Sequence, residues 1–532
     1  MSKFRKIRCL LGAFFFVSSV WPWTLYASSL DWLLINGRVV DGTGASEQAL
    51  AVGSIDGRLQ LYQSDAPLPS AKRVIDVSGL VVAPGFIDPH THARADLLSD
   101  HKNAVVNYLT QGVTTLAIGN DGDGTPEIQQ RFERLEQKGT GTNVVQFVGH
   151  GSLRRAVIGN EDREATATEL DAMERSLHVA FEQGAAGLSL GLFYTPGNYA
   201  PTSEIVRLCR VVAEWGRVCE GHIRSESSRG AGVYAAIEEM IAIGEQSGAA
   251  MHIAHIKVLG KDVWGGSERV IELIERAQEA GVSITADQYP WIASSTQLKN
   301  AILSAEWLAG SRSVWRDRLL DDRNKQAVIS DLEQGISRRG GGDRLMLVAT
   351  GDPGIEGLRL NQVAAKWRVT EAQAALKLLQ DAPPRVVSFN MSEPDIANFM
   401  KRPWVATSSD GTDGHPRKYA SFPRKYHQYV VAQKLLSLPE FVRSSTALAA
   451  QILGLSDRGV LKNGFVSDVV VFNPESYRDA ANFQNWDQLT SGVDWLFIAG
   501  NPVIERGHYE GALHGQNLAL PKVSVRVKKL KH

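Results

Sequence analysis

The chain has 532 residues, of which 43% are hydrophobic and 22% charged, and its formal net charge at pH 7 is −1. This composition is ordinary for a globular enzyme, and the near-zero charge without long basic runs in the body of the chain argues against a nucleic-acid partner. The basic tail "VRVKKLKH" is short, and a solvated end is the simpler explanation for it.

The N-terminus has the three regions of a secretory signal peptide. Four basic residues in "MSKFRKIRC" precede the apolar run "LLGAFFFVSSVW", and Ala27 follows as a small residue at the expected cleavage site. Removal of residues 1–27 would take away four positive charges and change the net charge from −1 to −5. We therefore expect a periplasmic or secreted protein with no stable membrane anchor after cleavage; an uncleaved anchor is the alternative.

Both ends of the remaining chain are rich in short strands. Residues 31–80 alternate β-rich runs with Gly, Asp and Pro turns. Residues 460–527 begin with the same alternation, in "FVSDVVVFNP" and "VDWLFIAGNPVIERG". No helical periodicity separates these strands. The pattern predicts one small β-sandwich built from both termini.

The centre, residues 81–459, alternates strands with amphipathic helices, which is typical of βα units around a parallel sheet. Eight apolar runs are strand candidates, and eight such units predict an α/β fold of the (β/α)₈ barrel type. Residues 296–400 are too long for one crossover and predict a helical, lid-like insertion over the barrel mouth. The strand candidates are 81–88, 114–119, 143–149, 186–190, 217–222, 250–255, 282–287 and 403–409.

Two cysteines, Cys209 and Cys219, remain after the predicted cleavage. Two cysteines in a chain of this size are not a disulfide framework, so we expect buried free thiols. An oxidising compartment leaves one bridge open as the alternative.

Histidines and an aspartate follow four of the predicted strands. Barrel active sites form at the carboxyl ends of the strands, so these side chains should converge there. Imidazole and carboxylate groups suit Zn²⁺, which takes about four such ligands, and the pattern predicts one or two zinc ions. These residues are His90 and His92 after the first strand, His222 after the fifth, His255 after the sixth and Asp410 after the eighth.

A metal site with an open position predicts hydrolysis. Zinc lowers the pKa of bound water to about 7 and polarises a carbonyl group. Asp410 is the natural catalytic acid and base, since it could take a proton from that water and pass it to a leaving amine. The predicted reaction is hydrolysis of an amide or a related C–N bond.

Motifs along the chain resemble those of the amidohydrolase superfamily and, within it, the D-aminoacylase (N-acyl-D-amino-acid deacylase) family. "GFIDPHTH" is similar to the shared first-strand motif, and "QGVTT", "FVGHGSLR", "AAGLSLGLFYTPGNYA", "GHIRSES", "HIAHIKV", "DQYPW", "FNMSEPD" and "SSDG" followed by "HPRKYASFPR" resemble the family in order. The resemblance extends from about residue 31 to about residue 520 and implies the amidohydrolase type of barrel.

The resemblance implies roles for matched positions. His90, His92 and Asp410 would hold one metal ion, and His222 and His255 would hold the second, catalytic one. Lys257, Tyr289 and Arg417 would bind the α-carboxylate of an N-acyl-D-amino acid, and Tyr194 would orient the acyl amide. A carbamylated Lys257 bridging two metal ions is the less favoured alternative.

Two departures from the family pattern bear on the site. The family has a Cys metal ligand in "GNCG", whereas this chain has "AIGNDGDG", so we expect Asp121 to replace the thiolate; a turn-capping loop aspartate is the alternative. The short spacing in "SSDGTDGHPR" makes Arg424 an alternative to Arg417 as the carboxylate anchor.

The combined prediction is an exported, zinc-dependent hydrolase of N-acyl-D-amino acids, whose partner is a small molecule with a free carboxylate. A dipeptidase that releases a C-terminal D-residue is the nearest alternative. A deaminase of a nucleobase-like ring, with Glu226 as its acid, is a further one, although Lys257 and Arg417 have no role on a neutral ring. Arginines 312, 316 and 318 of the insertion have no assignable role in side-chain specificity.

Overall fold

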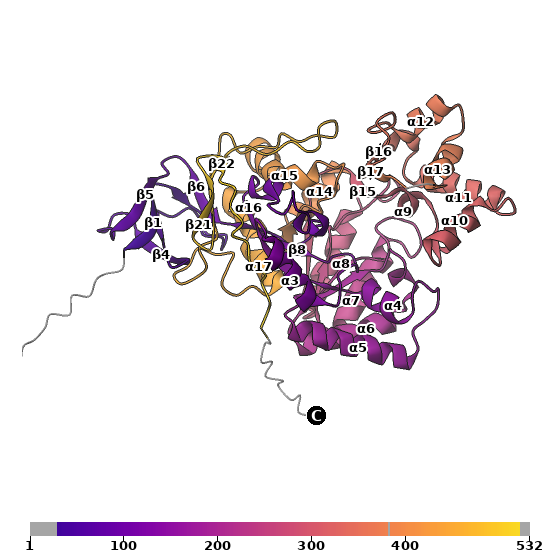
Figure 1. Cartoon of the computed structure of the whole chain (residues 1–532), viewed down its shortest axis with the longest axis horizontal. Helices are drawn as coiled ribbons and strands as arrows, with labels where there is room; N and C mark the ends of the chain where they lie inside the picture. The colour runs from indigo at the N-terminus through magenta and orange to yellow at the C-terminus, as the bar shows by residue number, and fades with distance from the viewer. Residues whose placement is uncertain (1–28, 381–382, 522–532) are drawn as a thin grey trace, which may run out of the picture.

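The computed structural model describes residues 29–380 and 383–521, which form a β-sandwich, a barrel and an insertion on the barrel (Figure 1). The sandwich lies at one end of the molecule and the insertion at the other. The predicted signal peptide, residues 1–27, lies outside the described residues. No helix within the described part combines the length and apolar character needed to cross a membrane.

The sandwich consists of two sheets whose strands come from both ends of the chain. One sheet has the order β4-β3-β1-β5 and the other β2-β6-β19-β20-β21-β22. Trp32 and Phe497 stack in the core between them, with ring centroids 4.4 Å apart. The strands are β1 (Leu30–Ile35), β2 (Arg38–Val39), β3 (Leu50–Ile55), β4 (Arg58–Gln63), β5 (Ala71–Asp76), β6 (Val81–Pro84), β19 (Val469–Phe472), β20 (Val493–Ile498), β21 (Asn501–Glu505) and β22 (His508–Tyr509).

The first predicted barrel strand, 81–88, is divided between the two parts of the molecule. β6 pairs antiparallel with β19 in the sandwich, whereas β7 (Phe86–Asp88) pairs parallel with β8 in the barrel. Gly85 joins them, and a Cβ at this position would lie 2.3 Å from the Thr114 side chain. The barrel therefore begins at residue 86 rather than 81, because only a glycine fits where the chain changes sheets.

Parallel strands in the predicted chain order form the barrel, which confirms the fold class. The third predicted strand is broken at Phe147 into β9 and β10, and a parallel bridge between Thr91 and Gly411 joins the first and last units. The strands are almost entirely buried, as expected for parallel strands covered on both faces. After β7 they are β8 (Val113–Ile118), β9 (Asn143–Gln146), β10 (Val148–Gly149), β11 (Gly187–Gly191), β12 (Val218–His222), β13 (Ala250–Ile253), β14 (Ile284–Gln288) and β18 (Val405–Thr407).

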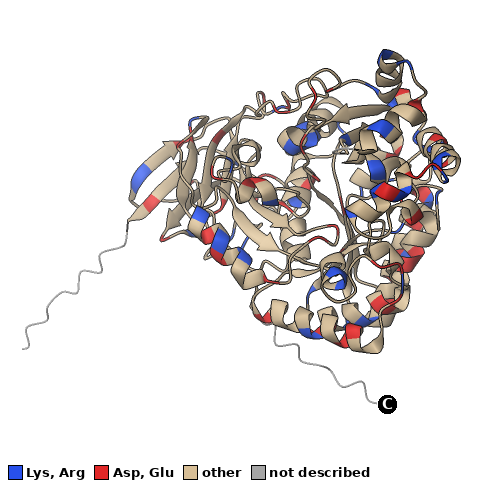
Figure 2. Ribbon diagram, turned by 45° about the vertical axis from the view of Figure 1, so that its right-hand side comes forward, with Lys and Arg blue, Asp and Glu red and all other residues tan. Residues whose placement is uncertain are grey.

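Helices surround the barrel, and Figure 2 shows basic and acidic residues interspersed along them. The longer ones, such as α5 and α8, bury an apolar stripe and expose a charged face, the pattern that the sequence periodicity predicts. The helices are α1 (Arg94–Leu97), α2 (Val106–Leu109), α3 (Ile128–Lys138), α4 (His150–Val157), α5 (Ala167–Glu182), α6 (Thr202–Glu214), α7 (Val233–Ser247), α8 (Ser267–Glu279), α14 (Glu393–Met400), α15 (Arg417–Arg424), α16 (Leu438–Ser445) and α17 (Ala447–Leu453).

The insertion has its own hydrophobic core and contains a small sheet as well as helices. The sheet has the order β15-β17-β16, which corrects the prediction of a helical insertion. Helix α14 packs against α8 of the barrel, and the insertion therefore ends near residue 388 rather than 400. Its elements are β15 (Ser294–Gln297), α9 (Leu298–Ile302), α10 (Arg312–Leu320), α11 (Lys325–Arg338), β16 (Leu345–Val348), α12 (Leu360–Trp367), α13 (Glu371–Gln380) and β17 (Arg385–Ser388).

The last described residues return to the barrel instead of extending the sandwich. Asn517 forms a parallel bridge with Val144 of β9, and Arg217 donates a hydrogen bond to the Leu520 carbonyl. Residues 510–521 therefore pack against the barrel, whereas the sequence prediction assigned them to the sandwich.

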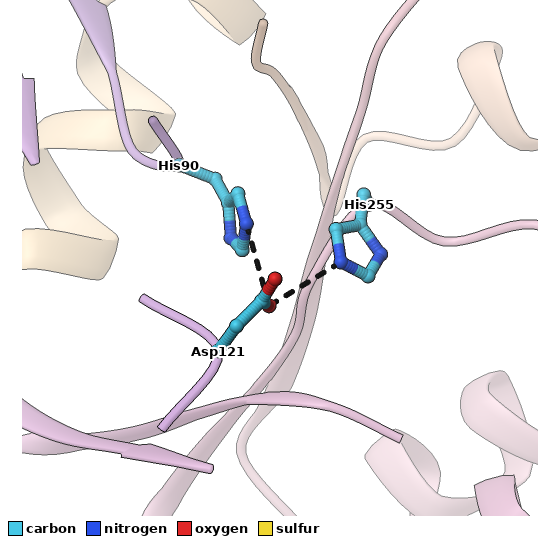
Figure 3. Close-up of side chains that lie close together, drawn as sticks. All are labelled: His90, Asp121 and His255. Atoms are coloured by element: carbon cyan, nitrogen blue, oxygen red, sulfur yellow. Dashed lines mark ion pairs between the residues drawn. The ribbon is translucent and has the colours of Figure 1, made fainter. Parts of the chain in front are cut away.

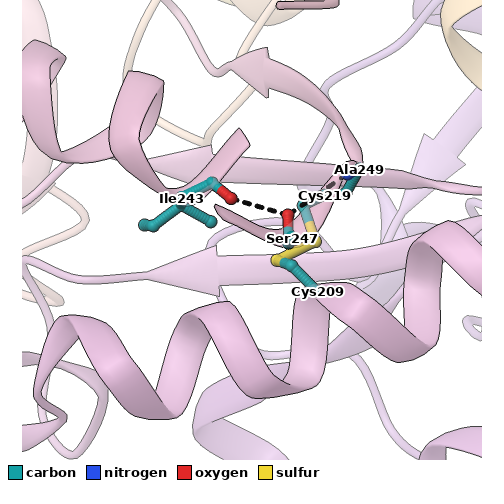
Figure 4. Close-up of a disulfide and its surroundings, with 5 residues drawn as sticks. All are labelled: Cys209, Cys219, Ile243, Ser247 and Ala249. Atoms are coloured by element: carbon teal, nitrogen blue, oxygen red, sulfur yellow. Dashed lines mark hydrogen bonds between the residues drawn. A yellow bond between two sulfur atoms is a disulfide. The ribbon is translucent and has the colours of Figure 1, made fainter. Parts of the chain in front are cut away.

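Cys209 and Cys219 form a disulfide, which corrects the expectation of free thiols (Figure 4). Cys209 lies on α6 and Cys219 on β12, and both are fully buried. Helix α6 directly precedes β12 and packs against it. This packing brings together two thiols that lie ten positions apart in the sequence.

Candidate metal centre

All six predicted metal ligands lie at the carboxyl ends of barrel strands. Asp121, the predicted replacement for the family cysteine, lies in the loop after β8. The other five occupy the strand ends predicted from the sequence: His90 and His92 after β7, His222 at the end of β12, His255 after β13 and Asp410 after β18. Barrel topology thus gathers residues up to 320 positions apart in the chain.

Asp121 lies between His90 and His255 (Figure 3). Its Oδ1 lies 3.5 Å from Nε2 of His90, 3.5 Å from Nε2 of His255 and 3.9 Å from Nδ1 of His222. Its Oδ2 lies 3.5 Å from Nε2 of His92. Asp121 therefore faces all four imidazoles, a position that a loop aspartate capping only its own turn would not occupy.

Asp410 faces the two histidines that follow β7, His90 and His92. Its Oδ1 is 3.1 Å from Nε2 of His92 and 3.9 Å from Nε2 of His90, and its Oδ2 is 2.7 Å from Nη1 of Arg417. One carboxylate oxygen thus faces the candidate ligands and the other faces a guanidinium.

Three of the candidate ligands have strained backbones. Positive φ angles occur at Asp121 (56°), His255 (36°) and Asp410 (46°), a region that non-glycine residues rarely adopt. Gly191 makes room for the Asp121 loop, because a Cβ there would lie 2.2 Å from the Asp121 carbonyl oxygen. Strain of this kind gathers at functional sites, where it aims side chains that a regular strand would not aim.

Glu220 of β12 is a site residue that the sequence analysis missed. Its Oε1 lies 2.7 Å from Nδ1 of His90, and both side chains are completely buried. A carboxylate on Nδ1 leaves Nε2 of His90 facing the cluster, the usual arrangement behind a metal-bound histidine. The sequence contained a signal, since Glu220 and His222 are two positions apart on one strand and so point to the same side.

Two buried atoms at the centre of the cluster have no hydrogen-bond partner among the described residues: Nε2 of His90 and Oδ1 of Asp121. Buried polar atoms are nearly always satisfied, and a bound ion is one of the few explanations for an exception. The nitrogen and oxygen donors also suit zinc. Three groups of residues each bring potential ligand atoms within 4.8 Å of one another, and the groups share His90 and His255. They are His90 with Asp121 and His255, His90 with His92 and Asp410, and His222 with Glu226 and His255.

Both aspartates of the cluster are held in the charged form. Burial opposes the charge of Asp121, but His90 and His255 outweigh it and lower the pKa of Asp121 well below its usual value. Burial also opposes the charge of Asp410, and there Arg417 and His255 lower the pKa well below the ordinary range. Both carboxylates are therefore available as anionic ligands at neutral pH.

His222 and His255 differ in protonation. Burial lowers the pKa of His222 to about 4, so its imidazole is neutral at pH 7. Burial and Lys257 also act to lower the pKa of His255, but Asp410 and Glu226 outweigh them and raise it to about 9. A cation bound here would therefore displace a proton from His255.

The predicted carboxylate-binding residues lie together beside the cluster. The Lys257 ammonium and the Arg417 guanidinium both lie over the Tyr289 ring, at 5.5 Å and 4.6 Å from its centroid. Tyr194 packs against His222, with ring centroids 4.8 Å apart. Arg424 instead pairs with Asp479 and is absent from the residues lining the site cavity, so the geometry favours Arg417 as the anchor.

Glu226 links the carboxylate-binding residues to the metal cluster. It lies 2.5 Å from Nζ of Lys257, 3.1 Å from Nδ1 of His255 and 3.8 Å from Nε2 of His222. Nζ of Lys257 also lies 2.7 Å from Nδ1 of His255, so the lysine joins the carboxylate-binding group to the same histidine.

No protein-family model matches the chain. An N-acyl-D-glutamate deacylase of Alcaligenes xylosoxydans xylosoxydans is 31% identical over 88% of this chain and 93% of its own, and a D-aminoacylase of the same organism is 30% identical over 92% and 97%. The crystal structure of an N-acyl-D-glutamate deacylase from Bordetella bronchiseptica, complexed with zinc and a phosphonate inhibitor, superposes with a TM-score of 0.79 at 31% identity, covering 92% of this chain and 100% of that one. The resemblance inferred from the motifs is confirmed, and the chain belongs to the D-aminoacylase family of amidohydrolases.

Proposed function

We propose that the protein is a zinc-dependent hydrolase that cleaves the amide bond of N-acyl-D-amino acids to a carboxylate and a free D-amino acid. The observation that carries the proposal is the juxtaposition of the histidine–aspartate cluster with a cationic pair above one tyrosine ring, Lys257 and Arg417 over Tyr289. The cluster suits a metal-activated attack on an amide, and the cationic pair suits the binding of a carboxylate next to that amide.

The zinc would be held by the imidazoles and the two aspartates of the cluster, with Asp121 between the two ligand groups. When bound, zinc activates a water molecule and polarises the scissile carbonyl. Glu220 would hold the His90 ring with Nε2 toward the cluster, and Glu226 would do the same for His255 through Nδ1.

Asp410 would carry the proton between the two steps of the reaction. Its carboxylate is charged at neutral pH and can accept a proton from the attacking water. The same group then donates that proton to the leaving nitrogen, which departs as the amine of the product. Arg417, 2.7 Å from Oδ2, keeps Oδ1 turned toward the cluster.

Lys257, Tyr289 and Arg417 would fix the substrate by its α-carboxylate. A guanidinium and an ammonium over one ring hold a single carboxylate in a defined position. Tyr194 packs against His222 and lines the same cavity as these groups, where it is placed to contact the acyl amide. The reacting bond would then lie between the carboxylate anchor and Tyr194, next to the cluster.

The test is the release of free amino acid from a panel of N-acetyl-D- and N-acetyl-L-amino acids and of dipeptides with a C-terminal D-residue, using purified, zinc-loaded protein. We expect hydrolysis of N-acetyl-D-amino acids and none of their L-enantiomers. Faster cleavage of the dipeptides would make the protein a dipeptidase. Absence of hydrolysis throughout the D-series, with zinc bound, would refute the proposal.

We further propose that the protein acts outside the cytoplasm. The signal-peptide pattern of residues 1–27 supports this location, and so does the Cys209–Cys219 disulfide, since disulfides persist mainly in oxidising compartments. Cell fractionation with N-terminal sequencing tests it. A periplasmic or secreted product beginning at Ser28 is expected, and a cytoplasmic product that retains Met1 would contradict it.

A further inference from the structure

A second cavity lies directly beside the site cavity, the one that His222, His255 and Asp410 line. The site cavity has a volume of about 360 Å³ and the second cavity about 230 Å³. Four residues line both cavities, and each of the four is partly exposed, so their side chains border open space. The shared residues are Phe193, Thr195, Arg229 and Asn300.

The barrel and the insertion each form one wall of the second cavity. The barrel wall comes from the loops after β11 and β12, and the insertion wall from the segment that includes the end of α9 and the 3₁₀ helix η2 (Ala305–Leu308). What the cavity accepts therefore depends on the insertion as well as on the barrel. The insertion residues are Asn300, Leu303, Ala305 and Leu308.

Most of the surface inside the second cavity is apolar. Leu192 and Phe193 line it from the barrel, and Leu303 and Leu308, which belong to the hydrophobic core of the insertion, line it from the other side. A cavity of about 150 Å³ with a lining of this kind holds a benzene molecule. The second cavity is larger, so it has room for an apolar chain of about six carbons.

Both cations in the lining of the second cavity already have protein partners. Arg224 pairs with Glu239 at 2.8 Å and donates to two backbone carbonyls, each at 3.0 Å. Arg229 donates to the Ser304 hydroxyl at 2.7 Å, and that hydroxyl donates to Asp331. These bonds turn the guanidinium groups toward the protein and leave a lining suited to an uncharged ligand.

A third cavity of about 260 Å³ differs from the second in charge. It also adjoins the site cavity, with which it shares Tyr194 and Thr195, but three of its lining residues are cations: Arg155, Lys299 and Arg312. An apolar chain that leaves the site cavity would therefore enter the second cavity, whereas an anionic chain would enter the third.

The second cavity begins next to the residue proposed to contact the acyl amide. Its described lining includes neither a candidate metal ligand nor a member of the carboxylate-binding group. Phe193 follows β11 directly before Tyr194, and its ring centroid lies 5.4 Å from that of His222. With the α-carboxylate held by Lys257 and Arg417, the acyl chain is placed to pass Phe193 and leave the metal centre on this side.

We propose that the second cavity binds an apolar acyl chain, so that the preferred substrates are N-acyl-D-amino acids whose acyl group has about six carbons rather than two. The inference rests on the proposed function and deepens it, because it names the acyl class of the same site. Burial of the added methylene groups between the barrel and the insertion supplies the preference.

The experiment compares kcat/KM for the N-acetyl, N-butanoyl and N-hexanoyl derivatives of the D-amino acid that is cleaved best as its N-acetyl derivative, using zinc-loaded protein. We expect kcat/KM to rise about threefold for each added methylene, and so about 80-fold from acetyl to hexanoyl. The N-glutaryl derivative has a chain of similar length that ends in a carboxylate. It should be cleaved at least about tenfold more slowly than the hexanoyl derivative, because an apolar cavity does not repay the desolvation of a charge.

Two variants fill the second cavity from opposite walls. Ala231 and Ala305 are exposed alanines that line it from the barrel and from the insertion. Ala231→Trp and Ala305→Trp should each lower the hexanoyl-to-acetyl ratio at least about tenfold and change the rate on the acetyl derivative by less than about threefold. The acetyl rate also reports that each variant is folded.

Ala365→Trp is the matched control. Ala365 is an exposed alanine on α12 of the same insertion and lies outside the three cavities. Its hexanoyl-to-acetyl ratio should equal that of the wild type.

A wild-type rate that stays constant or falls with acyl length, or tryptophan variants that keep the wild-type ratio, would overturn the inference and leave the deacylase function standing. Faster cleavage of the glutaryl than of the hexanoyl derivative would overturn it in favour of an anionic chain. Variants that change the preference among D side chains at constant acetyl, and not the acyl preference, would overturn it by placing the side chain in the cavity. Failure to hydrolyse any N-acyl-D-amino acid would overturn the proposed function and this inference together.

Discussion

Replacing Glu220 by Gln should weaken zinc binding while leaving every proposed zinc ligand in place. Glu220 lies 2.7 Å from Nδ1 of His90, and neither side chain is exposed, so the charge-assisted bond is fully protected from water. Loss of such a carboxylate behind a metal-bound histidine costs about 10- to 100-fold in affinity. This corresponds to about 1.4 to 2.7 kcal/mol of binding free energy. Competition titration against a chelator of known zinc affinity measures it.

Glu204→Gln provides a matched control for Glu220→Gln. Glu204 is also a buried glutamate 2.7 Å from a buried histidine, His150, but it lies outside the metal cluster. Both variants should lose thermal stability, whereas zinc affinity should fall only in Glu220→Gln. Equal zinc affinities in the two variants and the wild type would refute the assignment of Glu220 as a positioning residue for His90.

Three further outcomes follow from particular buried groups. Asp410→Asn should lower kcat by about 100-fold or more because the proton carrier is lost. Steady-state kinetics on the folded, zinc-loaded variant measure this, and a retained kcat would contradict it. Burial lowers the pKa of Lys425 to about 7, so the wild type should gain up to about 1.4 kcal/mol of stability per pH unit between pH 7 and about 10. Melting curves of Lys425→Met should lack that gain, and an unchanged pH dependence would be inconsistent with the burial of a neutral amine. Cys209→Ser should cost about 3 kcal/mol, as expected for a closed loop of about ten residues, and thiol titration of the unreduced, denatured wild type should find no reactive Cys219.

The barrel and its metal cluster were predictable from the sequence because two local signals coincide there. Each strand contains an apolar run, and His or Asp follows several of them closely, as His90, His222 and Asp410 do. Strand topology then requires those ends to meet. Glu220 could have been found by the same alternation rule, since it is two positions before His222 on one strand.

Other features depend on packing that no local pattern encodes. The strand β15 has the polar sequence "SSTQ" and resembles a loop, so the insertion was expected to be helical. The Cys209–Cys219 bridge depends on how α6 packs on β12, and the change of sheets at Gly85 depends on the Thr114 side chain. Arg385 reaches the site cavity from β17 of the insertion, which has its own hydrophobic core. Only the tertiary structure brings this residue to the cavity.

Anomalous diffraction at the zinc edge, on crystals of the zinc-loaded protein, tests most directly whether distant side chains meet around an ion. We predict a zinc peak about 2.0 to 2.2 Å from His222, His255 and Asp121 at the carboxyl end of the barrel. Diffraction data without a zinc peak among these three side chains would contradict it.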